Sequence, residues 1–314
     1  MSVTQLSPAA VAATRRPRRT FDRDRFLAVA LAAPSILATA IFVYGFIGWS
    51  VRVSLSKWTG LIADYSFVGL DHYIGLLDDG RFQIDIRNTA IFTVLFLTFC
   101  LAIGLFLAVL LDQRLKGENL FRSIYMFPMA ISFIVTGVVW RWLMNSAAGS
   151  RISGLNLLFQ NLGLDFLISR WHLTDPPWGI AFVVLPAVWQ MSGFTMALYL
   201  GGLRAISEDL REAARVDGAS ELQTYRYIIL PLLQPVTLSA VIILGHISLK
   251  IFDLIVAISQ NNIALDVPGV YMWRTTFDGN NYGQGAAIGI IMLVTVALLI
   301  VPYLIYSMRT EAEQ

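Results

Sequence analysis

Long apolar runs separated by short polar segments dominate the chain. Six of these runs are long enough to cross a bilayer, because a transmembrane helix needs about 20 mainly apolar residues and must satisfy its own backbone. They cover residues 26–49, 89–111, 124–140, 178–203, 236–258 and 285–308. The fifth run is the only one that contains charged residues, Lys250 and Asp253. The pattern therefore predicts an all-α membrane protein with one domain of six transmembrane helices over residues 26–308.

The amino-acid composition supports this fold class. Hydrophobic residues make up 56% of the 314 residues and charged residues 14%, whereas soluble domains contain about 25% charged residues. The formal net charge of +2 is too small, and too diluted by apolar sequence, for a protein held to nucleic acid by phosphate contacts. The only cysteine, Cys100, excludes an intrachain disulfide and any zinc or iron–sulfur site built from cysteines.

Basic residues are unevenly distributed between the two sides of the predicted membrane domain. If the N-terminus lies inside, the inner segments hold 14 Lys and Arg in 75 residues, and the outer segments hold 8 in 102. Because basic residues favour the cytoplasmic side, we expect cytoplasmic tails at residues 1–25 and 309–314. The arginine-rich first tail also resembles a secretory or twin-arginine signal. The apolar run after it, however, is far longer than the roughly 7–15-residue core of a signal.

The inner segment over residues 204–235 has the pattern of a helical elbow, in which two short helices meet at a turn. Ser207 is placed to cap the first helix. The opening turn of that helix contains Glu208 and Asp209, which are favourable at the positive end of a helix dipole. Asp217-Gly218 then interrupts the helical pattern and predicts the turn.

The second helix of the elbow begins with its own capping signal. Ser220 and Gln223 have the spacing of a capping box. We expect Leu230-Pro231 to end this helix, because the residue before a proline disfavours helical geometry. One face of the helix would carry Leu222, Tyr225 and Ile229.

The elbow also carries a spaced signature. Glu212-Ala213-Ala214 is followed after three intervening residues by Gly218. Nine more residues separate Gly218 from Ile228, which is followed by one residue and Leu230-Pro231. This spacing resembles the cytoplasmic EAA loop of binding-protein-dependent ABC importer permeases at every signature position.

Other segments extend the resemblance over roughly residues 26 to 308. Asp217-Gly218-Ala219 resembles the sugar branch of that family, the maltose and glycerol-phosphate type. Asp266-Val267-Pro268 and Thr275-Thr276-Phe277 resemble permeases for glucose and related glucosides. The chain departs from many relatives at Ser259–Asn262, where they have a glycine-glycine-proline turn.

The resemblance implies a type I ABC importer permease fold and a set of partners. Such a permease is paired with a second, homologous permease subunit, two ATP-binding subunits and an extracytoplasmic sugar-binding protein, in the cytoplasmic membrane of a prokaryote. The chain itself would be no enzyme and would bind no cofactor, because the partner subunits use ATP and Mg. Consistently, it contains no G-x-x-x-x-G-K-[ST] phosphate loop.

In such families the elbow docks into a groove of the ATPase and transmits its motion to the membrane helices. By resemblance, a glutamate anchors this contact, small residues permit close approach, and a glycine sets the turn. The alternative interpretation is an ordinary capped loop helix. The predicted ATPase-coupling residues are Glu212, Ala213, Ala214, Asp217 and Gly218.

The substrate path is predicted from polar groups within the membrane segments, because ionisable residues there are costly and are therefore functional candidates. Lys250 and Asp253 are three residues apart, on one face of a continuous helix, and form either a structural ion pair or a sugar-facing site. Sugars need hydrogen-bonding groups beside an aromatic or apolar surface. The substrate-binding candidates are Trp189, Gln190, Phe194, Ser248 and Asp253. An uncharged sugar is favoured, because the spans contain no Arg or Lys cluster to bind a phosphate.

Two other classes of protein remain as alternatives. An intramembrane serine hydrolase could use Ser192 and His246 as nucleophile and base, but Ser192 lies in Gln-Met-Ser-Gly and not in a G-x-S-G sequence. An ion-coupled secondary transporter would leave the elbow signature unexplained and would normally show inverted repeats with broken helices.

Overall fold

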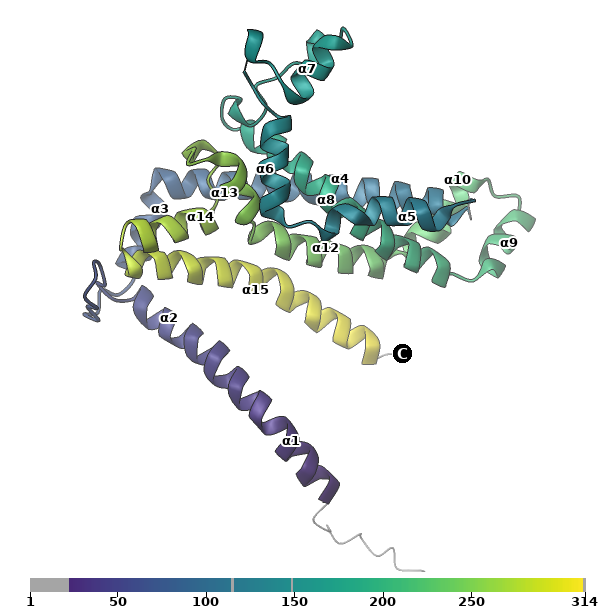
Figure 1. The fold of residues 1–314 in the computed structure, drawn as a ribbon. Coiled ribbons are helices and arrows are strands. Elements are labelled where there is room, and N and C mark those ends of the chain that lie inside the picture. Colours follow the sequence, from purple (N-terminus) through teal and green to yellow (C-terminus); the bar gives the residue numbers. More distant parts are fainter. Residues whose placement is uncertain (1–22, 114–115, 148, 313–314) are drawn as a thin grey trace, which may run out of the picture. The chain divides into compact units, whose positions relative to one another are not determined.

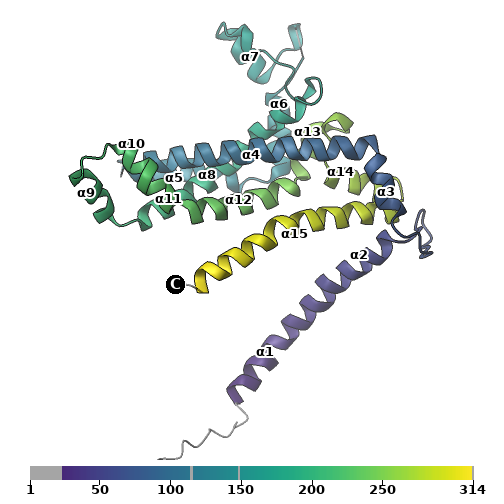
Figure 2. The same ribbon diagram turned by 180° about the vertical axis from the view of Figure 1, so that it is seen from behind.

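A computed structural model describes residues 23–113, 116–147 and 149–312 (Figures 1 and 2). The regular structure within these ranges is helical, apart from isolated β-bridges that join Ser56 to Phe67 and Thr59 to Asn281. Most of the predicted N-terminal tail, residues 1–22, lies outside the described residues, as do the last two residues of the predicted C-terminal tail. The chain divides into two compact units, residues 1–49 and residues 50–314.

The first unit is a single helical run. It comprises α1 (Arg23–Thr39), the π-helical η1 (Ala40–Gly45) and the start of α2 (Phe46–Ser54). The stretch Val29–Ser54 is long and apolar enough to cross a membrane, and none of its most hydrophobic window is buried within the chain. A continuous helix satisfies its own backbone hydrogen bonds, as a membrane-spanning segment must.

The second unit is a bundle of long helices with shorter ones at both ends. Its first half contains α3 (Asp71–Asp78), α4 (Gly80–Asp112), α5 (Glu118–Met126), η2 (Phe127–Ala130), α6 (Phe133–Leu143), η3 (Gly149–Arg151), α7 (Gly154–Asn161), η4 (Asp165–Leu167) and η5 (Trp171–Leu173). Its second half contains α8 (Gly179–Ala205), α9 (Glu208–Val216), α10 (Glu221–Thr224), η6 (Tyr225–Ile229), α11 (Leu230–Leu232), α12 (Gln234–Leu249), α13 (Asp253–Ser259), η7 (Ile263–Leu265), α14 (Pro268–Trp273), η8 (Arg274–Asp278) and α15 (Tyr282–Ala312).

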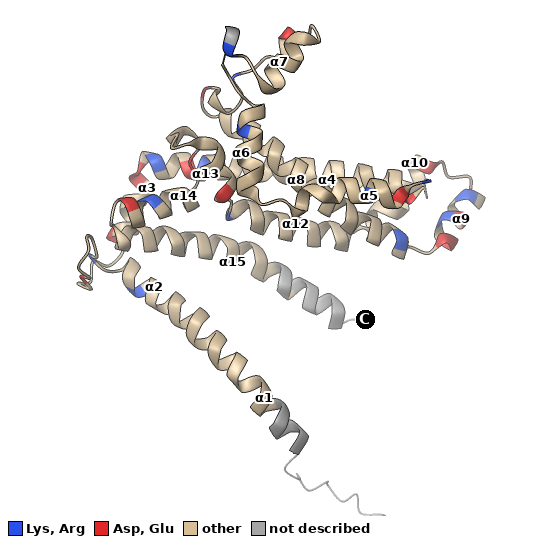
Figure 3. Cartoon of the chain, in the orientation of Figure 1, with Lys and Arg blue, Asp and Glu red and all other residues tan. Residues whose placement is uncertain are grey.

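The centre of this bundle is the pairing of α4 with α8, which lie side by side in both views (Figures 1 and 2). Buried residues recur along α4 every three or four positions, from Asp85 to Leu111, so that one stripe of the helix faces its neighbours. Gly104 permits the closest approach, because a Cβ atom there would lie 2.6 Å from Cβ of Thr195 in α8. Charged residues lie mainly near the ends of the long helices (Figure 3).

The structure contains four continuous candidate spans: Val29–Ser54, Gly80–Asp112, Gly179–Ala205 and Tyr282–Pro302. Two further candidates are bent pairs. Glu118–Ala130 and Phe133–Leu143 meet at 98°, and Glu221–Leu232 and Gln234–Leu249 meet at 62°. The described chain therefore has between four and six spans, depending on whether each bent pair counts as one.

Two predicted spans are not the continuous helices that the pattern indicated. The run over 124–140 is interrupted because Pro128 lies in a 3₁₀ turn and Ser132 caps a new helix by accepting a hydrogen bond from the backbone N–H of Ile134. The run over 236–258 stops at Leu249 and resumes at Asp253. Hydropathy detects neither break, because both sides of each are apolar.

Candidate coupling elbow and translocation path

The elbow follows α8 and has the predicted local structure at its start. The Ser207 hydroxyl accepts a hydrogen bond from the backbone N–H of Asp209 at 3.3 Å, which caps α9. Gly218 has a φ of +77°, in the left-handed region that glycine adopts without strain. Ser220 and Gln223 form the predicted capping box at the start of α10.

The second helix of the elbow differs from the prediction in two respects. First, the helix does not end at Leu230-Pro231. It continues from α10 through the π-helical η6 into α11 and ends at Leu232. Pro231 is the second residue of α11. Leu222 is 79% exposed, so the predicted shared face holds only for Tyr225 and Ile229, which pack inward.

The predicted coupling residues occupy two sides of α9 and the following turn. Glu212, Ala213, Asp217 and Gly218 are exposed, whereas Ala214 is buried within the chain. Ala214 therefore does not form part of the outward surface of the elbow. The sequence pattern did not predict that Val216, at the end of α9, is 87% exposed. An apolar residue beside a glycine turn is not recognisable as exposed from sequence alone.

Two ion pairs attach the elbow and its base to neighbouring helices. Arg211 of α9 donates from Nη2 to Oδ2 of Asp112, the last residue of α4, at 2.8 Å. Arg204, in the last turn of α8, donates from Nη2 to Oε1 of Glu118 in α5 at 2.7 Å. The first pair is the more sheltered, because its side chains are 18% and 9% exposed.

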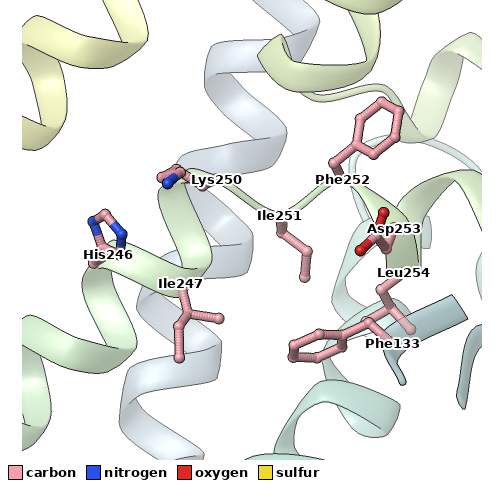
Figure 4. A pocket seen from close by; sticks show the side chains of 8 residues that line it. All are labelled: Phe133, His246, Ile247, Lys250, Ile251, Phe252, Asp253 and Leu254. Atoms are coloured by element: carbon pink, nitrogen blue, oxygen red, sulfur yellow. The ribbon is translucent and has the colours of Figure 1, made fainter. Parts of the chain in front are cut away.

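The break between α12 and α13 changes the interpretation of Lys250 and Asp253. Both residues belong to the described part of the chain, and no ion pair joins them. Their predicted position on one helical face is wrong, because Lys250 follows the last residue of α12 and Asp253 opens α13. Both line a cavity of about 250 Å³ with His246 and Phe133. Figure 4 shows the two charged side chains on opposite sides of Ile251.

The other predicted substrate contacts in α8 do not line this cavity. Gln190 donates from Nε2 to the backbone carbonyl of Ile131, at the bend between α5 and α6. Trp189 lies 6.0 Å, between ring centroids, from Trp140 of α6. Phe194 packs against the buried core. Gln190 and Trp189 therefore contact the bent pair of α5 and α6, and Phe194 contacts the core.

Ser248 is also placed away from the cavity. It is fully buried, donates to the carbonyl of Gly245 at 2.8 Å, and accepts a hydrogen bond from the Thr93 hydroxyl at 3.0 Å. It joins α12 to α4. Among the five predicted substrate residues, only Asp253 lines the cavity at the break.

A cluster of charged residues that the sequence pattern did not indicate lies at the end of the bundle opposite the elbow. Arg81, near the start of α4, donates to Oδ2 of the fully buried Asp266 from both Nε and Nη2. Arg274 lies 4.0 Å from the same oxygen. Neither carboxylate oxygen of the buried Asp85 has a hydrogen-bond partner within the described residues. Arg81 and Asp266 are 185 positions apart, which is why local spacing carried no signal.

The same cluster includes a hydrogen bond between Tyr271 of α14 and Asp79, the residue before α4. Burial and this contact raise the pKa of the Tyr271 phenol to about 12. Its hydroxyl therefore stays protonated and donates to Oδ2 of Asp79 at 2.7 Å. The Arg81 guanidinium lies 4.5 Å from the centre of the Tyr271 ring, a cation–π contact that helps to hold α14 against α4.

The segment that departs from the glycine-glycine-proline pattern still makes a tight turn. Gln260 and Asn261 adopt φ values of +45° and +77°, the left-handed region that glycine would enter freely. Arg274 donates from Nη2 to the side-chain oxygen of Asn261 at 2.8 Å. The turn is therefore built from non-glycine residues in the left-handed region.

Comparisons with known proteins agree with this architecture. The family described as the inner membrane component of binding-protein-dependent transport systems matches residues 100–309. A probable ABC transporter permease of Pyrococcus horikoshii is 40% identical over 88% of this chain and 94% of its own length. The xylose/arabinose import permease of Haloferax volcanii is 36% identical over 86% of this chain and 84% of its own length.

Solved structures show the same fold. A bacterial ABC transporter that imports the acidic polysaccharide alginate matches with a TM-score of 0.76 and 23% identity, over 91% of this chain and 96% of that one. The same type of transporter, in complex with a periplasmic protein that holds an alginate pentasaccharide, matches with a TM-score of 0.74 and 24% identity, over 89% and 93%.

The chain belongs to the family of inner membrane components of binding-protein-dependent transport systems. It is an all-helical, multi-pass ABC permease subunit of the inner membrane and not an enzyme, in a family whose members typically bind no cofactor. These predictions are confirmed. The hydrolase and secondary-transporter alternatives are wrong, because the family is a non-catalytic component that depends on a binding protein.

Proposed function

We propose that this chain forms one half of the translocation path of an ATP-driven sugar importer, with both termini in the cytoplasm. Its relatives include permeases named for xylose/arabinose, α-glucoside and trehalose/maltose transport. The absence of an Arg or Lys cluster from its apolar segments favours an uncharged sugar. A homologous second permease subunit, two subunits that use ATP and Mg, and an extracytoplasmic sugar-binding protein complete the transporter.

The observation that carries the coupling part of this proposal is the elbow. α9 is capped by Ser207, followed by the turn at Gly218 and tied to α4 by the Arg211–Asp112 pair. Ala214 is buried, whereas Glu212 and Ala213 are exposed on the same helix. The small side chain of Ala213 lets another backbone approach, and Glu212 offers a charge that fixes the register of the contact. Asp217 closes α9, because its N–H donates to the carbonyl of Ala213 at 3.0 Å.

The sugar path is proposed at the break between α12 and α13. Asp253 offers a carboxylate beside Phe133 and Phe252, the combination of polar group and ring surface that sugars require. Lys250 lies on the other side of the break and balances the negative charge of Asp253 without forming an ion pair with its carboxylate. The other four candidates do not line the cavity and are proposed to support the helices around the path. They are Trp189, Gln190, Phe194 and Ser248.

Glu212→Ala tests the coupling role. The variant chain should insert and pair with the second permease subunit, but it should retain less of the ATPase subunits on co-purification and lose stimulation of ATP hydrolysis by the binding protein. Glu221→Ala is the matched control, because Glu221 is an exposed acidic residue of the same elbow outside the signature. Normal retention and stimulation in Glu212→Ala would contradict the assignment of the elbow.

A further inference from the structure

Among the described residues, α4 is the long apolar helix best built to resist bending. It runs without interruption from Gly80 to Asp112, about 50 Å at 1.5 Å per residue. Sharp kinks in helices arise at prolines and π turns, and α4 contains neither. The other three continuous candidate spans each contain a proline, at positions 34, 186 and 302.

One end of α4 is tied to the elbow. Asp112 accepts the 2.8 Å hydrogen bond from Arg211, which immediately precedes Glu212. In the same last turn of α4, Leu111 and Ala108 belong to a buried cluster with Ile229 of the elbow's second helix. The Asp112–Arg211 pair is therefore a partly buried, charge-assisted hydrogen bond next to an apolar cluster. Such a bond is stronger than an ion pair exposed on the surface.

The other end of α4 is tied to the loop over residues 261–266. Arg81 binds Asp266 with a double hydrogen bond. Asn88 donates from Nδ2 to the backbone carbonyls of Ala264 and Asp266, both at 2.9 Å. Because two of these acceptors are backbone atoms, the loop itself is held and not only one of its side chains.

We propose that α4 is the strut that carries motion of the elbow to the 261–266 loop at the opposite end of the bundle, with Asp112, Arg81 and Asn88 as positioning residues. This inference rests on the proposed function, since it takes the elbow as the part that the ATPase moves. A stiff helix tied at both ends displaces its far contacts when its near end is moved along its axis. The strut thus links ATP-driven movement to a loop that makes no contact with the elbow.

A reporter on the loop tests the strut. Ile263 is exposed, and Cys100, the only native cysteine, is fully buried, so that a fluorophore can be placed on Ile263→Cys. In the complete transporter in nanodiscs, ATP with binding protein should change the signal. Asp112→Asn and Asn88→Ala should each reduce this change about fivefold or more, while the ATPase subunits still co-purify. Glu118→Gln is the matched control, since it removes the ion pair to Arg204 at the same end without touching α4.

The outcomes separate the strut from the coupling role of the elbow. An undiminished loop signal in Asp112→Asn or Asn88→Ala overturns the strut, and so does an equal loss in Glu118→Gln. Failure of both variants to assemble also counts against it, because the contacts would then be structural only. If ATPase subunits bind the chain equally well with and without Glu212, it is the proposed function that fails.

Discussion

Adding a single methyl group at Gly104, in the contact between α4 and α8, should lower the stability of the chain. A Cβ atom at this position would lie 2.6 Å from both Cβ and Cγ2 of Thr195 and 3.0 Å from the backbone nitrogen of Met196. Thr195 is fully buried, and its hydroxyl donates to the carbonyl of Met191 at 3.1 Å. The clash thus involves atoms at or next to the backbone, which a change of rotamer cannot move away.

The two opposing effects on stability can be weighed. Overpacking of a core costs about 1–3 kcal/mol, and replacing a helical glycine with alanine returns about 1 kcal/mol. We therefore expect Gly104→Ala to lower the free energy of unfolding by up to about 2 kcal/mol. At about 2–4 °C per kcal/mol, the thermal midpoint should fall by several degrees. Gly201 of α8 is the matched control, because a Cβ atom there would meet nothing within 4 Å, and Gly201→Ala should raise the midpoint.

Thermal unfolding of the purified chain in detergent, followed by intrinsic fluorescence, measures both variants. Adding Thr195→Gly to Gly104→Ala moves the small residue across the contact and should recover part of the loss. The packing argument fails if Gly104→Ala is as stable as Gly201→Ala, since the close approach of α4 and α8 at Gly104 would then not exist.

Two further predictions concern the sugar path and the orientation. Asp253→Asn should preserve the yield of assembled complex but lower sugar transport in vesicles about tenfold, the value of one charge-assisted hydrogen bond; recovery on adding Lys250→Gln would instead indicate an ion pair. For orientation, Ser220→Cys should resist an impermeant thiol reagent added outside intact cells and Ile263→Cys should react, against the unchanged chain with its buried Cys100 as the control. Reversed labelling would place the elbow on the wrong side for an ATPase.

Several local features of the elbow were predictable from sequence. The caps at Ser207 and Ser220 and the turn at Gly218 agree with the structure, because each depends on residues within four positions of one another. The sequence pattern also separates the apolar middles of the helices from their polar ends. Membership of the permease family was carried by the same short segment, whose spacing is set by one helix and one turn.

The candidate sugar path was less predictable. A helical pattern placed Lys250 and Asp253 on one face, but the helix breaks between them. The sequence did not predict this break, because the residues on both sides of it are apolar. Gln190 has a side chain that suits a sugar contact, yet it donates to the backbone carbonyl of Ile131. This carbonyl needs a side-chain partner because the helix is interrupted at the neighbouring bend. A polar residue in an apolar run has the same signature whether it faces a substrate or an interrupted backbone.

The extents and caps of helices follow from the local sequence, because hydrogen bonds and hydrophobic periodicity within a helix involve residues a few positions apart. The ties of α4 to Arg211 and Asp266 span 99 and 185 positions, and no periodicity connects residues so distant. They arise only when α4 packs against α8 and brings its two charged ends to the elbow and to the 261–266 loop. Which helix links the two ends of the molecule is therefore decided by packing, since a charge acquires its partner only from the geometry of the assembled bundle.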